Sequence, residues 1–205
     1  ICRDIASMDE KCLIVSLIGI PASGKSTIAQ LILNLSRENS LKANVIAIEF
    51  DALIELDFDR ISHGDLKKCR EELFTKIERN LRSSDLQRNL KISSNAIHTR
   101  PENAITLIIL DDNMYYRSMR QRVRQMCKNC DCRHFQIFMK SSLSDAIARN
   151  AQRKSIVTND VIEKMFNDLE IPINSRTLVV EVEKIDKTFL LSELNDRIDN
   201  PETFT

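Results

Sequence analysis

The chain has 205 residues, of which 42% are hydrophobic and 29% charged, with three glycines and four prolines. This length and composition exclude a low-complexity protein and fit one compact domain over residues 1–205. Thirty Lys and Arg balance thirty Asp and Glu, so the overall charge excludes general attraction to DNA, and a polyanion would need a local basic patch. The apolar runs are too short to cross a membrane, and the cysteines lie mostly in apolar periodic segments. We therefore expect a soluble cytoplasmic protein without a membrane partner.

The first half of the chain alternates short apolar runs with amphipathic stretches. Residues 11–20 form an apolar run with Val and Ile that ends at a Pro/Gly turn, which predicts a buried strand. Apolar positions at helical spacing then predict a helix that ends near the polar stretch 37–40. A second strand is predicted over residues 43–50, and a longer amphipathic helix over residues 65–81.

The same alternation continues after a polar interruption. Residues 82–103 lack periodicity and contain a proline, so we predict a flexible loop. A third strand is predicted over residues 105–110, a helix over 115–128 and a fourth strand over 134–139.

The last third of the chain opens on a capping pattern. Ser142, followed three residues later by Asp145, predicts the start of a helix that runs through Arg153. Three further elements are predicted, namely a helix over 159–169, a strand over 177–182 and a helix over 189–198. Alternation of apolar strands with helices indicates a three-layer α/β/α sandwich around a mainly parallel, five-stranded sheet.

Residues 19–26, Gly-Ile-Pro-Ala-Ser-Gly-Lys-Ser, match the phosphate-loop pattern between a buried strand and a helix. This context predicts a P-loop kinase fold that binds ATP, with backbone N–H groups directed at the phosphates. Lys25 would reach the β- and γ-phosphates, and the Ser26 hydroxyl would bind Mg²⁺. The residues predicted to hold the nucleotide are Gly19, Pro21, Ala22, Ser23, Gly24, Lys25, Ser26 and Thr27.

Two carboxylates follow predicted strands, where ligands of an open parallel sheet bind. Asp111 ends the third strand, and we expect it to hold Mg²⁺ through water. Asp51 ends the second strand and could accept a proton from an attacking hydroxyl. Acids at strand ends also cap helices and turns, so a purely structural role stays open for both.

Two sets of basic residues share helix faces. Arg149 and Arg153 are four residues apart and could close on the transferring phosphoryl group, although exposed arginines are more often solvated. A second set, spaced by three, four and four residues, predicts a basic stripe for a phosphate backbone or, as the alternative, a solvated face. That stripe consists of Arg117, Arg120, Arg124 and Lys128.

Residues 127–134 carry three cysteines and a histidine, which resembles half a zinc site. There is no second Cys-x-x-Cys pair, and Cys127 falls on the apolar side of its predicted helix. We therefore favour a structural role for this cluster over zinc.

The phosphate loop, the strand end at Asp51, and residues 110–120 and 148–153 together resemble L-seryl-tRNA(Sec) kinase of the eukaryotic kind. The stretch 111–120 is more specific than the phosphate loop. The resemblance implies phosphorylation by ATP and Mg²⁺ of the serine on seryl-tRNA(Sec), with Asp51 as catalytic acid/base and Arg149 and Arg153 as lid arginines. It also implies a helical, C-terminal tRNA-binding domain, which we expect to be absent from residues 1–205.

Two other functions fit the same loop and sheet. One is a tRNA-associated regulatory ATPase of the Elongator accessory type, and the other is a small-metabolite kinase, which would need no basic stripe. The stretch Asp-Asn-x-Tyr-Tyr-x-Ser-Met-Arg, at 112–120, favours the seryl-tRNA(Sec) kinase.

Overall fold

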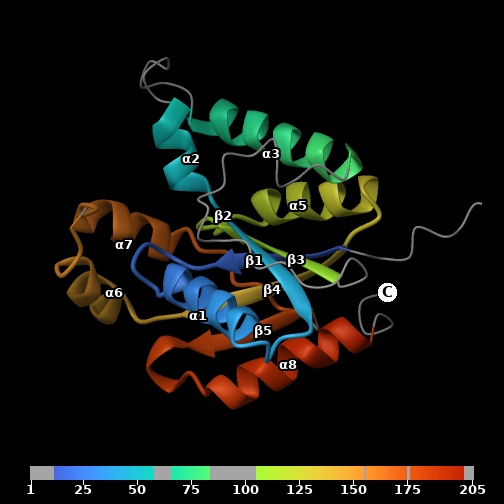
Figure 1. Ribbon diagram of the computed structural model, residues 1–205. Coiled ribbons are helices and arrows are strands. Elements are labelled where there is room, and N and C mark those ends of the chain that lie inside the picture. The colour runs from blue at the N-terminus through green and yellow to red at the C-terminus, as the bar shows by residue number, and fades with distance from the viewer. Residues whose placement is uncertain (1–11, 58–65, 84–104, 155, 175, 201–205) are drawn as a thin grey trace, which may run out of the picture.

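The protein is a three-layer α/β/α sandwich around a five-stranded parallel sheet in the order β2-β3-β1-β4-β5. The computed structural model describes residues 12–57, 66–83, 105–154, 156–174 and 176–200. Figure 1 shows the strands running side by side with helices above and below them. The strands are β1 Cys12–Ile18, β2 Ala43–Glu49, β3 Ile105–Asp111, β4 Arg133–Lys140 and β5 Thr177–Glu181. The predicted fold class is confirmed.

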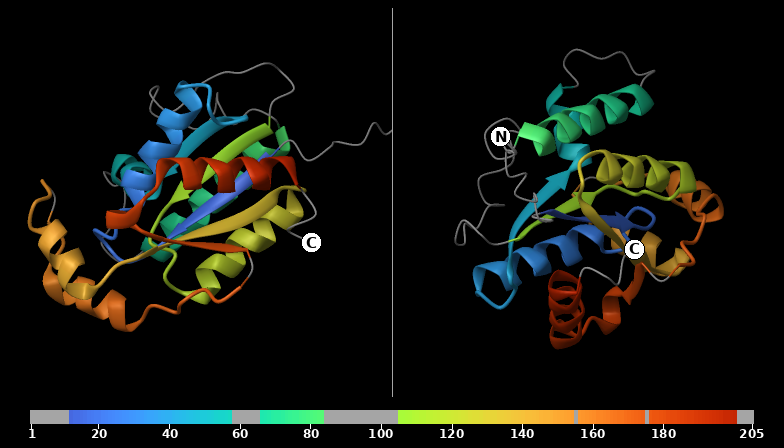
Figure 2. Two further views of the ribbon diagram at one scale, coloured as in Figure 1. Left: turned by 90° about the horizontal axis from the view of Figure 1, so that it is seen from below. Right: turned by 90° about the vertical axis from the view of Figure 1, so that its right-hand side faces the viewer.

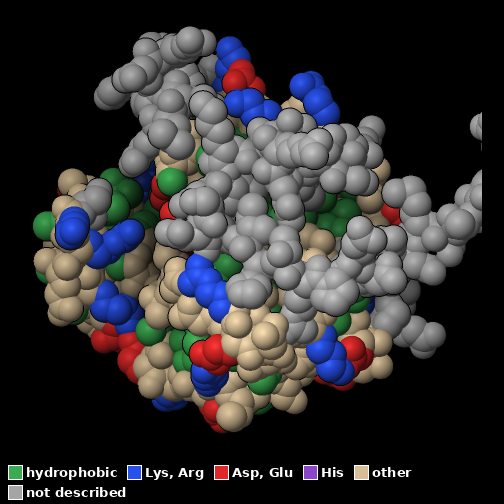
Figure 3. Space-filling model, viewed as in Figure 1, with side chains coloured by type: hydrophobic (Ala, Val, Ile, Leu, Met, Phe, Trp, Pro, Cys, Tyr) green, Lys and Arg blue, Asp and Glu red, His purple; other side chains and the backbone are tan. Residues whose placement is uncertain are grey.

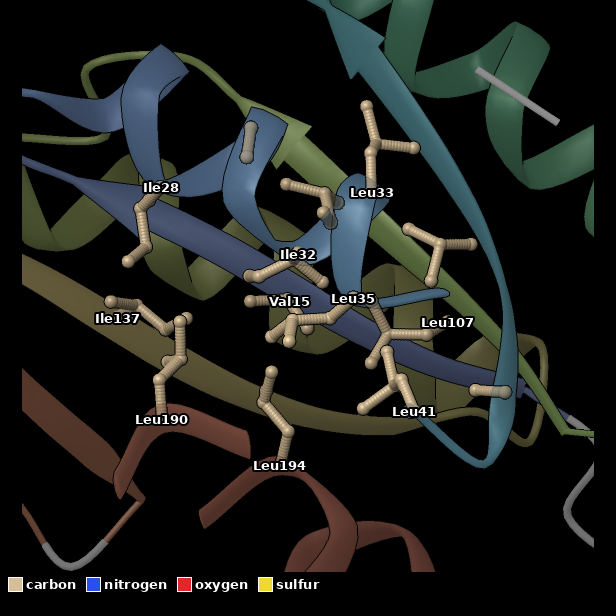
Figure 4. Close-up of a cluster of buried hydrophobic side chains, with 14 of the residues drawn as sticks. Val15, Ile28, Ile32, Leu33, Leu35, Leu41, Leu107, Ile137, Leu190 and Leu194 are labelled. Carbon is tan, nitrogen blue, oxygen red and sulfur yellow. The ribbon is translucent and has the colours of Figure 1, made fainter. Parts of the chain in front are cut away.

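The central strand β1 is buried on both faces, which explains its continuous apolar sequence. Val15 belongs to the cluster under α1 (Lys25–Arg37) and α8 (Lys187–Asp199), and Figure 4 shows it facing side chains from both helices. Its neighbour Ile14 belongs to the opposite cluster. Alternation along the strand therefore supplies apolar groups to both layers.

The opposite face of the sheet is covered by α3 (Leu66–Ser83) and α5 (Arg117–Asn129), as the two turned views in Figure 2 also show. Helix α2 (Phe50–Asp57) follows β2 directly. Helices α6 (Leu143–Asn150) and α7 (Asn159–Asn167) lie together beyond one end of the sheet (Figure 1). None of the helices in the described ranges is long and apolar enough to cross a membrane.

The predicted strands and helices are all present with shifted boundaries, and helix α2 after β2 was not predicted. The predicted cap is confirmed, because the Asp145 N–H donates to Ser142 Oγ at 3.1 Å. The helix that follows ends at Asn150 instead of Arg153, because the Asn150 side chain bonds the backbone of Val157. Its Nδ2 donates to Val157 O at 2.6 Å, and Val157 N donates to its Oδ1 at 3.2 Å. Most of the predicted flexible loop, residues 84–103, lies outside the described residues.

Candidate active site

A cavity of about 590 Å³ opens at the carboxyl ends of the central strands, next to the start of α1. The phosphate loop forms its floor, while α7, the ends of β2 and β3, and the short 3₁₀ helix Val182–Lys184 contribute to its walls. The predicted residues that it brings together are Lys25, Ser26, Asp51, Asp111, Arg149 and Arg153. Ligands of open parallel α/β sheets bind at this position.

Six of the eight residues predicted to hold the nucleotide line this cavity, and Gly19 and Ser23 lie outside its lining. Ser23 is fully buried, and the Gly19 N–H donates to Asn113 O at 3.0 Å. Gly19 therefore ties the phosphate loop to the segment after β3. One side of the phosphate loop is therefore bonded to the protein, and the other side faces the cavity.

Gly24 precedes α1 in a left-handed conformation, with φ 97°. A Cβ at this position would lie 2.0 Å from Cγ2 of Val182, far inside contact distance. Glycine is therefore required by the backbone angle and by the approach of Val182 from the end of β5. The start of α1 leaves N–H groups without helical partners beside the cavity, which suits a bound phosphate.

Lys25 is 8% exposed, although it lines the cavity. Its ammonium donates to Gly19 O at 3.1 Å and to Ile20 O at 2.8 Å, so two loop carbonyls hold it at the floor. Burial lowers the pKa of Lys25 to about 8, against the opposing effect of Asp111 and Asp112. A bound phosphate would raise this pKa again and favour the ammonium form.

We expect nucleotide affinity to fall as the pH rises above 8. The Lys25 amine of the free protein loses its proton near pH 8, and phosphate needs the ammonium form. The association constant for ADP should therefore fall by up to about tenfold per pH unit above the pKa of Lys25, with proton uptake on binding. Calorimetry from pH 7 to 9.5 in buffers of different ionisation enthalpy would measure both, because phosphates titrate lower, near about pH 6. A flat profile would contradict this role of Lys25.

Asp111 and Ser26 form a pair of oxygen groups beside Lys25. Asp111 is 8% exposed, and burial raises its pKa, while Lys25 and a hydrogen bond from Ser26 act in the opposite direction. A carboxylate and a hydroxyl are the hard ligands that Mg²⁺ prefers, with water and phosphate oxygens completing the shell. These two residues therefore fit the predicted metal position.

Asp51 lies in the first turn of α2, at the cavity. Asp51 was predicted to end the second strand, but β2 ends at Glu49 and Asp51 belongs to the eight-residue helix α2 that follows. Its side chain is exposed and faces the same cavity as Lys25 and Asp111. An acid in a first helical turn also favours the helix dipole, so Asp51 combines a structural position with access to a substrate.

Asp112 has a different environment from Asp111. Its side chain is 1% exposed and accepts two hydrogen bonds from the Arg70 guanidinium of α3, at 2.6 and 2.9 Å. The Asn113 N–H donates to the same carboxylate at 2.7 Å. Asp112 therefore fixes α3 against the end of β3. The Arg70 guanidinium neutralises the Asp112 carboxylate, which lies next to Asp111, the predicted Mg²⁺-binding residue.

We expect Arg70→Met to lower the free energy of unfolding by about 2–4 kcal/mol. The change leaves the Asp112 carboxylate buried without its partner, and breaking a buried pair from one side costs about 3–5 kcal/mol; partial exposure of Arg70, 25%, reduces this figure. Urea unfolding at pH 7 measures it. Lys187→Met is the matched control, because Lys187 and Glu38 are half exposed and such pairs add little. Equal midpoints for the two variants would contradict the prediction.

The two predicted lid arginines differ in their contacts. Arg149 Nε donates to Ala22 O of the phosphate loop at 2.8 Å, and the same guanidinium contacts Glu183 and Ser141. Arg153 is exposed and lines the cavity beyond the end of α6. Arg149 is thus part of the walls that hold the phosphate loop, whereas Arg153 lies where an arginine could approach a bound phosphate.

The predicted basic stripe on α5 is wrong for Arg120. This side chain is 4% exposed and donates to Met114 O, Tyr115 O and Glu170 O at 2.9, 3.0 and 2.7 Å. The Arg120 side chain is buried because its guanidinium donates hydrogen bonds to carbonyls of two connecting segments, the one before α5 and the one after α7. Arg124 is half-buried, and only Arg117 and Lys128 of the four are exposed.

The cysteine-rich segment packs into the core. Cys127 is 3% exposed, within the cluster under α3 and α5. His134 shares a hydrogen bond of 2.8 Å with Ser16 Oγ, and burial lowers its pKa to about 3. Across the described ranges, no group of three or more His, Cys, Asp or Glu side chains is arranged to hold a metal ion.

Several residues at the site escaped the sequence analysis. Arg70, Val182 and the α7 residues Val161 and Met165 have no motif that marks them, because their roles arise from contacts between distant segments. Asn113 also lines the cavity, and it lies in the stretch 112–120 that carries the family resemblance, although no role was predicted for it.

Known proteins similar to this chain include L-seryl-tRNA(Sec) kinases. That of Methanococcus maripaludis is 26% identical over 189 residues, which cover 89% of this chain and 64% of the relative. That of Homo sapiens is 25% identical over 190 residues, covering 76% and 55%. The chain thus spans between about half and two thirds of the length of these relatives.

Two solved structures share the fold and contain nucleotide analogues. Chaetomium thermophilum Kti12 in complex with ADP-AlF3 has a TM-score of 0.63 and 17% identity, over 90% of this chain and 98% of that one. Mycobacterium tuberculosis APS kinase CysC in complex with AMPPNP and APS has a TM-score of 0.58 and 15% identity, over 91% and 97%. The architecture is therefore that of P-loop kinases.

A sequence profile assigns the chain at the family level. The profile described as chromatin associated protein KTI12 matches residues 12–195, from the first residue of β1 into α8. With the phosphate loop, the strand-ending acids and the parallel sheet inside that match, the chain belongs to the KTI12 family of P-loop proteins.

Proposed function

We propose that this protein is an ATP-dependent kinase that phosphorylates the serine of seryl-tRNA(Sec), giving O-phosphoseryl-tRNA(Sec). The observation that carries the proposal is the meeting of Lys25, Asp111 and Asp51 in one cavity. Similarity to L-seryl-tRNA(Sec) kinases over most of the chain supports this acceptor.

The nucleotide would lie along the phosphate loop. Residues Pro21, Ala22 and Gly24 to Thr27 line the cavity, so backbone N–H groups and the Lys25 ammonium would hold the β- and γ-phosphates. Ser26 and, through water, Asp111 would hold Mg²⁺. When bound, Mg²⁺ neutralises charge on the phosphates.

The acceptor hydroxyl would approach from the Asp51 side of the cavity. The serine oxygen forms a bond to the γ-phosphorus, the bond from that phosphorus to the bridging oxygen breaks, and ADP leaves. The hydroxyl proton passes to the Asp51 carboxylate. Arg153 would offset the charge spread over the transferring group, and Arg149 would hold the loop through Ala22.

A second candidate is a tRNA-associated regulatory ATPase of the Elongator accessory type. The observation in its favour is the match to the KTI12 family profile over residues 12–195. Such a protein would use the same loop, Lys25 and Ser26, but would transfer the phosphoryl group to water.

The fate of the γ-phosphate tests these candidates. Incubation with γ-labelled ATP and seryl-tRNA(Sec), followed by mild alkaline release and chromatography of the esterified amino acid, should give labelled phosphoserine. Label recovered only as inorganic phosphate, with release stimulated by tRNA, would favour the ATPase. In a parallel incubation to which a mixture of small metabolites is added, label on one of them with none on tRNA would establish a metabolite kinase. Unacylated tRNA and alanyl-tRNA serve as controls, because neither presents the serine hydroxyl.

A further inference from the structure

One wall of the cavity is apolar. Val157, Val161 and Met165 line it, and we call these three residues the α7 wall. Val161 and Met165 are four residues apart and share a face of α7, while Ile162 between them is fully buried against Ile20 and Ala146. Val161 is nevertheless 41% exposed. Neither phosphate nor a serine hydroxyl requires an apolar wall, so the α7 wall is available to an apolar part of a substrate.

The α7 wall lies on the Asp51 side of the phosphate loop. The segment after α7 is bound to the connection between β3 and α5: Tyr116 OH donates to Asp168 at 3.1 Å, and Glu170 N donates to Tyr115 O at 3.1 Å. Figure 1 shows α7 on the side of the loop toward α2, whereas β5 and α8 lie on the other side. Helix α7 therefore borders the region where the acceptor would enter.

The donor nucleotide would leave this wall free. Its γ-phosphate must lie beside Lys25, Asp111 and Asp51. The reason is that Asp51 is the proposed proton acceptor and Asp111 the proposed Mg²⁺-binding residue. The sugar and base would then extend toward the β5 edge, where Val182 and Arg149 border the cavity. The α7 wall consequently faces the acceptor.

The surface around α7 combines apolar groups with charged groups of both signs, since Asp160 and Glu163 of α7 are exposed too. Ile156 is 64% exposed and Phe166 37% exposed, and Lys154 and Lys164 are also exposed. Figure 3 shows hydrophobic and basic side chains next to one another over α6 and α7. Proteins bind single-stranded nucleic acid with side chains that cover the faces of its bases and with cations that attract its phosphates, and here aliphatic side chains would cover the base.

We propose that the α7 wall binds the terminal nucleoside of the aminoacylated RNA, by packing Val161 and Met165 against the face of its adenine. The base is thereby held next to the cavity while the esterified serine reaches Asp51. This inference rests on the proposed function and adds how the acceptor end is recognised. It predicts that the nucleoside, and not only the serine, contributes to binding.

The test compares two acceptors and two variants. The acceptors are free serine and 3′-deoxy-3′-(L-serylamino)adenosine, a stable amide in which serine is attached to adenosine. The variants are Val161→Ser with Met165→Gln, which keeps the charge and removes apolar surface, and Val179→Ser, a control at another exposed valine, on β5 and 53% exposed. Binding of each acceptor is measured by calorimetry in the presence of AMPPNP, and transfer is measured with ATP.

The native protein and the Val179→Ser control should bind the adenosine amide more tightly than serine. In the Val161→Ser/Met165→Gln variant this advantage should fall by about tenfold, because the apolar area that the wall buries against the base is lost, with unchanged KM for ATP. Equal affinity of the native protein for both acceptors, or a rise in the KM for ATP instead, would overturn the inference. Binding of the amide through the α7 wall without phosphorylation of it or of seryl-tRNA(Sec) would leave the inference standing and refute the proposed kinase function.

Discussion

Asp51→Asn is expected to reduce phosphoryl transfer to seryl-tRNA(Sec) by about 10²–10⁴-fold, the usual contribution of a general base. Asparagine keeps the size of the side chain and its place in the first turn of α2, but it cannot accept the serine proton. Nucleotide binding should change little, because the contacts of the phosphate loop are made by other residues. Single-turnover transfer from labelled ATP measures the rate, and calorimetry with AMPPNP measures the affinity.

Glu49→Gln is the matched control for Asp51→Asn. Glu49 is exposed, ends β2 and lines the same cavity, so its replacement removes an equal charge from the same region. Transfer by this variant should stay within a few-fold of native. If Asp51→Asn instead weakens Mg²⁺-nucleotide binding with little further loss in transfer, Asp51 belongs to the metal site. Asp112 could not readily replace Asp51 as the general base in that case, because both of its carboxylate oxygens accept hydrogen bonds from Arg70.

Lys25→Met should lower ATP turnover by about 10²-fold or more, since it removes the cation that stabilises the transferring phosphate. The fold should survive. Because Lys25 is buried and its pKa is lowered to about 8, its charge opposes folding at pH 7, and this cost declines as the pH rises from about 8 to 10.5. Methionine fills the same space without a charge, so the melting temperature at pH 7 should be equal to or higher than that of the native protein.

Differential scanning calorimetry and a phosphate-release assay test the two parts of the Lys25 prediction separately. Lys187→Met is again the control, because this lysine is half exposed and pairs with Glu38 away from the cavity. Near-native turnover in a folded Lys25→Met variant would contradict the phosphate-binding role. A large loss of stability would show that the hydrogen bonds to Gly19 O and Ile20 O outweigh the cost of burying the charge.

Local patterns predicted most of the fold because each strand and helix carries its own periodicity. The apolar run through β1 and the Ser142 cap of α6 are short-range signals, and both are confirmed. The phosphate loop could likewise be recognised because its glycine, lysine and serine lie within eight residues. Helix α2 was missed, since eight residues directly after a strand are too few for a clear helical period.

Long-range contacts explain what the sequence could not predict. Arg120 has the helical spacing of a solvated stripe, but its guanidinium is buried by carbonyls up to 50 residues away. The partner of Gly24 is Val182, at the far end of the chain, and no local rule connects them. Spacing reports which face of a helix a residue occupies, but not which distant segment covers that face.

The two hydrogen bonds between the Asn150 side chain and the backbone of Val157 join the two ends of the turn that contains Arg153. Joining the ends of a short segment removes conformational freedom before any ligand arrives. If Arg153 binds a phosphate as proposed, part of the entropic cost of placing it there is met during folding instead of during binding. Loosening this junction should therefore weaken nucleotide binding without removing any group that would touch the phosphates.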